Sequence, residues 1–582
     1  MTAYKQQSLY KRIIDRQGQL ERKREPYDAA ADEIAELYRP DLISGKVGQQ
    51  SEGGFDHPDI VEGSAPHALL IWQRGFMGNM MSRRDIWFRQ RMIEPPQSTG
   101  ITFQGMDDVN HYLQDLNDHM TAIYRRSNYY DVSPEFLRDG GSVGSPVMLR
   151  EYDPLLDRYI MKVPPYQARW LDKDIFGQDN VLHVKWKWNA LQAAEFFGED
   201  NLPMCVKIQL QNGRHYDETE YIQAIYGAGD PIYSDLPEDV ALTRPWMEHF
   251  VCTSATQNEQ KILEPKNKGP GYFQRPFSSW HYHRNWHEVY SRTMAHFAIY
   301  DTRGANAHFE AVFGEAEVSL RPPTWAMRTM QSILDLTPGG ENYARNTKEY
   351  EMPPQFLQRA SGYDVGVDFG DRLIGNINRW FHVDLFMQIS QMILTKNQPE
   401  TAYGLMRAEA EKQGQLAPQV ETYETQVLGD THTGLLDAEM DREPAYPWGA
   451  LPEPPDIVKE FSEGGLDVEF VGPLSMAQIR DRTVLNFYRN LGVAEAVAGF
   501  SPEAMHKIKW PEALERVMEA GNFPQGDLRS ADEYAELVEG IRQRAIQAEV
   551  AQNAPKMAQA IKNLQGTTEQ GSPLKALTGD AA

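Results

Sequence analysis

Three histidines stand close together in the segment HYHRNWH, and imidazoles at short spacing can hold a metal ion. His281 and His283 fall on one side of a predicted strand, and His287 follows nearby. Two imidazoles at this spacing could ligate zinc or a related metal, but no further ligand stands at a suitable distance. The segment is therefore interpreted as a structural strand rich in aromatic residues, and no metal ion or other cofactor is expected.

Other spacings that carry catalytic chemistry are missing from the sequence. The glycine cluster DGGSVGSP at 139–146 lacks the lysine of a phosphate-binding loop, and no GxxxxGK[ST], HExxH or GxSxG occurs. A DFG at 368–370 has no HRD to accompany it. Glu409 and Glu411, two apart on a predicted helix, face different sides and make a poor acid and base pair. These observations predict a protein without enzymatic activity.

The segment VLHVKWKWN combines aromatic and basic side chains, which could bind a nucleic acid. As a strand it places Val184, Trp186 and Trp188 on one face and Lys185 and Lys187 on the other. Bases stack on aromatic rings while phosphates favour lysines, so a binding site would need both on one face. A half-buried strand is the favoured interpretation.

The composition indicates a multidomain globular protein with an acidic surface. The 582 residues are 41% hydrophobic, and 58 basic against 83 acidic residues give a net charge of -25. An acidic wall would repel DNA rather than grip it. Only Cys205 and Cys252 are present, too few for a disulfide framework, which suits a reducing cytoplasm. No signal sequence or membrane-spanning segment is expected.

Hydrophobic spacing predicts helices at both ends of the chain and strands between them. Two helices are expected within 1–40, separated by Pro26. A Met-rich helix should follow, and its inner face is formed by Leu69, Trp72, Phe76, Met80 and Met81. Another helix is expected over 109–129. Five short segments with alternating, β-branched or aromatic residues are expected to be strands: VMLREYD, RYIMKVP, VLHVKWKW, CVKIQL and YIQAIYG.

Long helices are predicted again over 289–313, 371–394 and 399–428. The last two are joined by the polar turn Lys396, Asn397 and Gln398. Pro418 lacks an N–H and is expected to kink the third helix near 414–418. The charged residues around it require that one helix face meet water or a polyanion.

At these helices the sequence resembles the head-to-tail connector, or portal, proteins of short-tailed bacteriophages. The blocks that carry the resemblance occur in the family's order: FGQDNVLHVKWKWNALQAAEFFG, EVYSRTMAHFAIYDTRGANAHFEAVFGEAEVSLRPP, FHVDLFMQI, TAYGLMRAEAEKQGQLAPQVETYETQVL, LPEPP and LDVEFVGPLSMAQ. The resemblance implies an α+β, mainly α-helical fold that assembles into a ring of twelve identical chains.

The resemblance also implies a division into wing, stem, clip and crown. In chain order these are the wing with N-terminal helices and then strands (1–288), stem helix 1 (289–316), the clip (317–368), stem helix 2 (369–395), the tunnel loop, kinked helix and wing return (396–474), the crown helices (475–563) and a disordered tail (564–582).

Site residues and partners follow from the same resemblance. The tunnel loop would be Lys396, Asn397 and Gln398, and channel-facing candidates on the next helix are Arg407, Glu409, Glu411 and Lys412. Clip contacts to the packaging motor or tail would be Arg321, Trp325, Arg328, Arg345 and Lys348. The expected partners are double-stranded DNA in the channel, the terminase large subunit, tail adaptor proteins, and major capsid and scaffold proteins. The expected location is the head-tail junction of the virion, after assembly in the host cytoplasm.

Two alternatives to a portal stay open at the level of sequence. One is a carboxylate- and metal-dependent hydrolase or nuclease, which the missing ligand motifs disfavour. The other is a different structural virion protein, such as a scaffold or internal core component.

Overall fold

The structure is a computed structural model that describes residues 8–42, 60–84, 86–92, 103–227, 230, 245–255, 260–266, 271–320, 324–325, 355–356, 363–387, 415–442, 449–456, 458, 466–472, 534, 537–544 and 547. The chain divides into two compact units. The first comprises Met1–Arg89, Asp118–Leu451 and Val468–Asp481, and the second Gln90–Asn117, Pro452–Asp467 and Arg482–Ala582. The described residues mix helices with strands, in agreement with the predicted α+β class.

The first unit begins with α2 (Leu9–Tyr38), a single helix where two were predicted. Pro26 lies inside this helix, although a proline removes one backbone hydrogen bond and usually interrupts a helix. Tertiary contacts hold the helix together here. The buried guanidinium of Arg24 donates to the carbonyls of Tyr166 and Arg169, which fixes the helix just before the proline.

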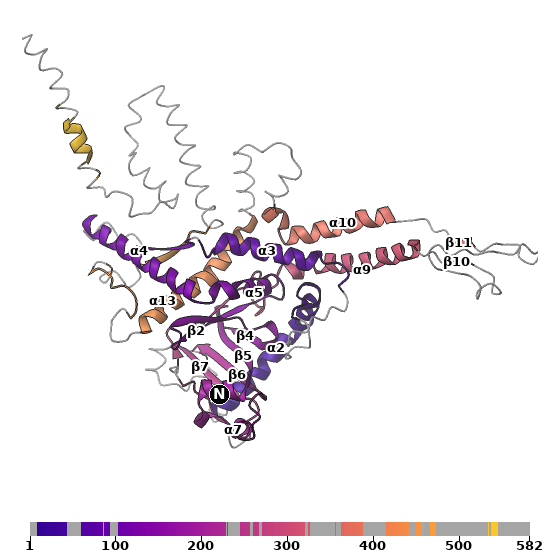
Figure 1. Ribbon diagram of the computed structural model, residues 1–582, viewed down its shortest axis with the longest axis horizontal. Helices are drawn as coiled ribbons and strands as arrows, with labels where there is room; N and C mark the ends of the chain where they lie inside the picture. The colour runs from indigo at the N-terminus through magenta and orange to yellow at the C-terminus, as the bar shows by residue number, and fades with distance from the viewer. Residues whose placement is uncertain are drawn as a thin grey trace, which may run out of the picture. The chain divides into compact units, whose positions relative to one another are not determined.

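An antiparallel sheet of five strands packs against α2 (Figure 1). Its order is β4-β5-β6-β7-β8. The strands are β4 (Arg169–Lys173), β5 (Asp179–Asn189), β6 (Glu218–Gly227), β7 (Trp246–Cys252) and β8 (Gly271–Tyr272). Ile13 and Leu20 of α2 are buried against Val181 and Ile222 of the sheet, so the helix covers one face of it.

The half-buried strand predicted from VLHVKWKWN is confirmed in β5. Val184 is buried, and the rings of Trp186 and Trp188 stack with their centroids 6.2 Å apart. On the other side of the strand, the ammonium group of Lys185 lies 2.7 Å from the carboxylate of Glu21. The aromatic and basic side chains therefore contact other parts of the protein.

A second, three-stranded sheet has the order β3-β2-β9, with β2 (Val147–Asp153) between β3 (Arg158–Lys162) and β9 (Phe277–Ser279). One predicted strand, CVKIQL, is wrong, because these residues lie in α7 (Met204–Gln211), which follows α6 (Ala190–Phe197). Pro203 immediately precedes α7 and suits a helix start. Of the α7 residues only Val206 is buried, so the alternation in the sequence did not reflect a sheet face.

Helices and aromatic rings form the largest core. As predicted, α3 (Ser64–Met80) buries Leu69, Trp72, Phe76 and Met80. The helix packs on α5 (Tyr129–Gly141), and the Trp72 ring stacks on that of Trp280 at 6.2 Å between centroids. Such contacts between large rings hold α3 and α5 together, and α10 (Tyr363–Trp380) packs on α3.

The helices α9 (Met294–Leu320) and α10 (Tyr363–Trp380) lie side by side (Figure 1). Between them in the chain, β10 (Thr324–Trp325) pairs with β11 (Gln355–Phe356). The predicted helix over 371–394 is wrong at one point, because the chain turns at His382, where φ is 53°, before a short helix at 383–387. Phe381 and Val383, on either side of the turn, are both buried, whereas residues two positions apart in a straight helix point to opposite faces.

The next described segment is helical from residue 415 and runs through the π-helical turn η6 (Glu424–Gly429) into α13 (Asp430–Arg442). The predicted kink at 414–418 falls at the edge of the described residues, and from 415 onwards the chain is helical through Pro418. The helix extends beyond the predicted end at Leu428.

The helix predicted over 109–129 is observed as α4 (Phe103–Arg126). In the second unit it buries Val109 and Leu113 with Val458, and in the first unit it buries Met120 and Tyr124. The predicted strand LDVEFVG is observed as β12 (Leu466–Phe470), which pairs with β1 (Phe88–Met92). Of the predicted crown region 475–563, the described residues 534, 537–544 and 547 are helical, and the tail 564–582 lies outside the described residues. Within the described part, no helix has the length and apolarity to cross a membrane.

Candidate functional site

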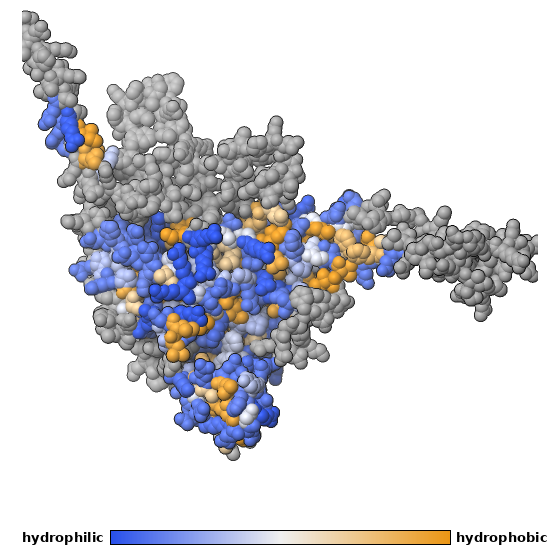
Figure 2. Space-filling view, viewed as in Figure 1, coloured by the Kyte–Doolittle hydropathy of each residue, from blue (hydrophilic) through white to orange (hydrophobic). Residues whose placement is uncertain are grey.

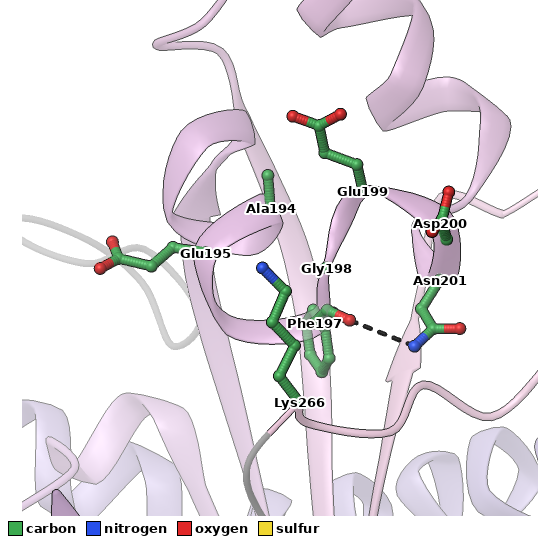
Figure 3. Close-up of a pocket in the computed structure, with 8 residues that line it drawn as sticks. All are labelled: Ala194, Glu195, Phe197, Gly198, Glu199, Asp200, Asn201 and Lys266. Atoms are coloured by element: carbon green, nitrogen blue, oxygen red, sulfur yellow. Dashed lines mark hydrogen bonds between the residues drawn. The ribbon is translucent and has the colours of Figure 1, made fainter. Parts of the chain in front are cut away.

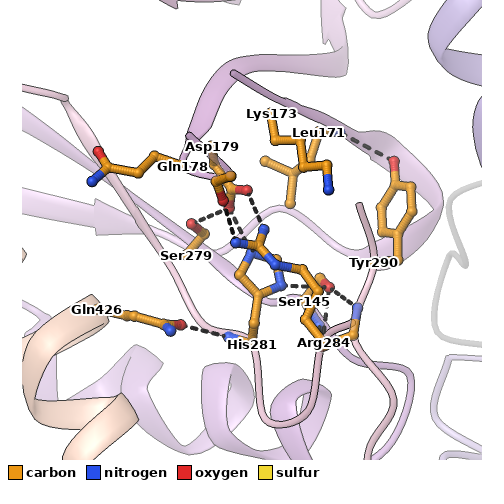
Figure 4. Close-up of polar contacts among 12 residues, drawn as sticks. Ser145, Leu171, Lys173, Gln178, Asp179, Ser279, His281, Arg284, Tyr290 and Gln426 are labelled. Atoms are coloured by element: carbon orange, nitrogen blue, oxygen red, sulfur yellow. Dashed lines mark hydrogen bonds and ion pairs between the residues drawn. The ribbon is translucent and has the colours of Figure 1, made fainter. Parts of the chain in front are cut away.

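The histidine segment leads into a buried polar network centred on Asp179, the first residue of β5 (Figure 4). One carboxylate oxygen of Asp179 accepts hydrogen bonds from His281 Nε2 at 2.6 Å and from Ser279 Oγ at 2.5 Å. The other oxygen lies 2.8 Å from Nη1 of Arg284. An imidazole, a guanidinium group and a hydroxyl thus converge on one carboxylate.

The pKa of Asp179 reflects these partners. Burial alone would raise the pKa of the carboxyl, but the charge and hydrogen bond of His281, together with Arg284, hold it well below its usual range. Asp179 is only 3% exposed. A carboxylate that is ionised and buried requires such partners, so the network stabilises the fold at neutral pH.

Ser145, His281 and Asp179 form a hydrogen-bonded chain like that of a serine hydrolase triad. The surroundings of Ser145 are not those of a catalytic serine. Ser145 Oγ is 3.2 Å from His281 Nδ1, and it also contacts the hydroxyl of Ser291 at 3.1 Å and accepts from the Ser291 backbone N–H at 2.9 Å. Ser145 is 1% exposed, so no substrate carbonyl can approach its hydroxyl. The network instead joins β5, β9 and the segment that precedes α9.

The three histidines of HYHRNWH diverge, which corrects the expectation that His281 and His283 share one side of a strand. Apart from a single bridge between His283 and Arg292, this segment has no strand structure. The ring of His283 lies near Phe297, while the His287 side chain is 81% exposed. Among the described residues, no group of three or more histidine, cysteine or acidic side chains could hold a metal ion.

The glycine cluster DGGSVGSP forms a packing centre rather than a phosphate loop. Asp139 accepts from the buried guanidinium groups of Arg39 and Arg169, each at 2.6 Å. A Cβ atom at Gly140 would lie 2.6 Å from the Trp280 ring, so α5 approaches this ring as closely as only glycine permits. The cluster therefore positions α5 against the aromatic core.

An open acidic depression of about 570 Å³ surrounds the end of α6 (Figure 3). Glu195, Glu199 and Asp200 line it, but their carboxylates point in different directions, and Lys266 lies between them. Asn201 Nδ2 donates to the carbonyl of Phe197 at 3.2 Å. Since the carboxylates do not converge, the depression has no arrangement for holding a metal ion or for acid and base catalysis.

The α9–α10 pair carries exposed aromatic side chains, and Figure 2 shows apolar side chains along these helices. Tyr300 is 75% exposed, and Phe313 and Phe369 are each more than half exposed. The ring of Phe297 stacks on that of Trp380 at 5.7 Å between centroids, and both remain partly exposed. Large apolar side chains gathered on one helix pair are typical of an interaction surface.

Most sequence-predicted site residues lie outside the described residues. These are the tunnel loop Lys396, Asn397 and Gln398, the channel candidates Arg407, Glu409, Glu411 and Lys412, and the clip residues Arg321, Arg328, Arg345 and Lys348. Trp325 lies in β10 opposite Gln355. Sequence reasoning missed the network around Asp179, because its carboxylate and the His281 ring are 102 residues apart in the chain.

Comparison with known proteins gives the family. Residues 10–528 match the family model described as "Bacteriophage head to tail connecting protein". The chain is also similar to a protein of Bordetella phage BPP-1 named "Probable portal protein", with 23% identity over 516 residues, which cover 86% of each chain. Because the family match extends over most of the sequence, this chain belongs to the bacteriophage head-to-tail connecting protein family.

Proposed function

We propose that this protein is the portal of a tailed bacteriophage. Identical chains form a ring, with twelve copies as the expected number, at the vertex where head and tail join. Double-stranded DNA enters the head through the ring during packaging and leaves through it during ejection. The terminase large subunit and tail adaptor proteins dock on it in turn, and it contacts the major capsid and scaffold proteins during assembly in the host cytoplasm.

The observation that carries this proposal is the family match over residues 10–528, and the α9–α10 pair supports it. Exposed aromatic rings on two packed helices are costly in water, and a second copy would cover them. In the proposed ring, α9 is stem helix 1 and α10 begins stem helix 2. The polar network around Asp179 fixes the segment that leads into α9, so it sets the position of this helix on the wing.

The remaining parts are assigned by the same proposal. The wing comprises 1–288 and the return segment that follows the tunnel loop, and the clip at 317–368 receives the motor and later the tail. Lys396, Asn397 and Gln398 constrict the channel, where the lysine ring meets the DNA backbone briefly and the acidic charge elsewhere prevents tight binding.

Electron microscopy of the purified protein, viewed along the particle axis, tests the proposal. The expected result is a closed ring with a central channel, and sedimentation as a monomer or dimer at all protein concentrations would contradict it. Tyr300→Glu places a charge on the exposed face of α9 and should lower ring formation at least tenfold while the far-ultraviolet circular dichroism stays unchanged. Tyr216→Glu, at a side chain that is 80% exposed on a turn of the wing, is the matched control and should assemble normally.

A further inference from the structure

Four arginines gather on the first unit where the chain leaves α3 and where α4 ends. Arg83 and Arg84 follow α3, while Arg125 and Arg126 form the last turn of α4, and all four side chains are exposed. Tyr130 interacts with one arginine of each pair, Arg83 and Arg125. The guanidinium carbon of Arg83 is 5.9 Å from the Tyr130 ring centroid, and the charges of Arg125 and Arg83 oppose the rise that burial causes in the pKa of this phenol. We call these four residues the arginine patch.

The arginine patch stands on a rigid base. Tyr130 is 8% exposed, and its hydroxyl accepts a hydrogen bond of 2.9 Å from Nε1 of the buried Trp87. The end of α4 is closed by Ser127, whose N–H donates to Ile123 and whose hydroxyl donates to Tyr124. Arg125 and Arg126 therefore project from a helix end that is held in place, and the ring beside Arg83 is fixed, which lowers the entropic cost of binding a ligand.

The four arginines differ from many others in this acidic chain. Arg39, Arg169 and Arg284, for example, each contact a carboxylate within 3 Å. In the part of the chain that the structure describes, none of the four arginines of the patch forms an ion pair with a carboxylate within 4 Å. The hydrogen bond from Tyr152 and then the charges of Arg442 and Arg126 lower the pKa of Asp157, so Arg126 has an acidic neighbour.

Stabilisation of a helix end does not account for the arrangement. Cations at the C-terminus of α4 interact favourably with the helix dipole, which would explain Arg125 and Arg126 alone. Arg83 and Arg84 come from a different segment, yet Arg83 approaches the same tyrosine as Arg125. Convergence of exposed cations from two segments is typical of a site for an anion with several charges.

We propose that the arginine patch binds the phosphate backbone of double-stranded DNA outside the channel, on the body of the wing. The planar guanidinium group matches two phosphate oxygens at once, and the patch contains arginine and no lysine. Repeated phosphates at fixed spacing satisfy several arginines together. The choice of DNA over an acidic protein segment rests on the proposed function, in which double-stranded DNA fills the head at whose vertex the ring stands.

The test measures binding of a fluorescent 20-base-pair duplex to the assembled protein over a series of salt concentrations. The double variant Arg83→Ala/Arg125→Ala is compared with Lys11→Ala/Arg22→Ala, which removes the same charge from exposed positions on α2. The patch variant should bind the duplex at least tenfold more weakly. The slope of log Kd against log salt concentration should be smaller by about two, since each phosphate contact contributes roughly 0.9 to this slope. The α2 variant should bind like the wild type.

Three outcomes would overturn the proposal: equal duplex binding by the patch variant and the wild type, an equal loss in both double variants, or the absence of duplex binding at low salt. If polyglutamate of equal charge displaces the duplex at the same concentration as unlabelled DNA, the patch serves an acidic protein instead. Electron microscopy of each variant separates this test from that of the proposed function. Intact rings of the patch variant that bind the duplex as well as the wild type does would reject the patch and leave the proposed function standing. Arg83→Lys/Arg125→Lys, which keeps the charge, should restore part of the binding.

Discussion

At the scale of single residues, the fold depends on buried charges that have several partners each. Asp179 and Asp139 both accept hydrogen bonds from two or more donors, and both are almost fully buried. A buried carboxylate contributes to stability only while its partners are present, because its desolvation is costly. These two networks join segments that are distant in sequence, so their loss should affect the whole first unit.

Replacing Asp179 with asparagine tests this view. Asp179→Asn leaves His281 and Arg284 without their carboxylate and should lower the free energy of unfolding by about 3 kcal/mol, measured by urea denaturation at pH 7. Asp217→Asn serves as the control, because Asp217 forms an ion pair with Arg214 in which both side chains are at least one-third exposed. That change should cost less than about 0.5 kcal/mol. Equal effects of the two substitutions would show that the buried network is not important for stability.

Buried histidines predict a loss of stability in mild acid. Burial, together with the charge of Arg16, lowers the pKa of His183 to about 3, and burial lowers the pKa of His432 to about 3. The unfolded chain, with a histidine pKa near 6.5, binds these protons first as the pH falls. The stability that these residues contribute is therefore complete above pH 6.5 and declines from there towards pH 3. Each histidine should lower the free energy of unfolding by up to about 1.4 kcal/mol per pH unit in this window.

Urea midpoints of the wild type and of His183→Gln at pH 7.5, 6.0 and 5.0 check this prediction. Glutamine can replace the hydrogen bond that joins the His183 ring to Gln17, but it does not take up a proton in this range. The variant should therefore lose less stability than the wild type between pH 6.0 and 5.0. Parallel pH profiles for the two proteins would contradict the assignment to His183.

At the scale of elements, close approach between α5 and the aromatic core determines how the first unit packs. A Cβ atom at Gly140 would overlap the Trp280 ring, which is fully buried and stacked on that of Trp72, so the ring has little room to move. Gly140→Ala should lower stability by about 1–3 kcal/mol through overpacking. The change is measured as a shift of the thermal midpoint.

The control for this element is Gly78→Ala on α3. A Cβ atom at Gly78 has no neighbour within 4 Å, and alanine favours a helix over glycine by about 0.8–1.0 kcal/mol. The midpoint should therefore stay the same or rise. A similar midpoint for both variants would mean that α5 can shift away from the tryptophan without cost.

The sequence predicted elements well where one hydrophobic period runs without interruption. The buried face of α3 and the two faces of β5 were predicted residue by residue, because in each the side chains follow one regular period along the element. The predictions failed where tertiary contacts decide the conformation. Contacts of Arg24 carry α2 past Pro26, and the turn at His382 buries both of its neighbours. A local pattern contains no information on such distant partners.

The candidate sites show the same limit. The resemblance in the helical blocks pointed to the family that the comparison then identified, because each block is a continuous stretch of sequence. The Asp179 network and the arginine patch could not be found by spacing, since each joins segments that are far apart in the chain or belong to different elements. The tunnel-loop and clip assignments stay predictions.

At the scale of the whole molecule, charge and apolar surface act against each other in the proposed ring. Each chain carries a net charge of -25, so neighbouring copies repel one another, whereas the exposed rings on α9 and α10 favour association. Salt screens the repulsion over about 8 to 10 Å near physiological ionic strength and does not weaken apolar contacts. The assembled fraction should therefore rise with salt.

Sedimentation velocity at fixed protein concentration in 20, 100 and 300 mM NaCl measures this effect. If apolar contacts hold the ring together, most chains should be dissociated at the lowest salt and assembled at the highest, with at least a tenfold change in the association constant. Dissociation with rising salt would mean instead that ion pairs between subunits dominate the interface, since salt weakens contacts between exposed charges. Tyr300→Glu distinguishes the two cases further: it adds one charge and removes one apolar contact, so higher salt should restore its assembly only in part.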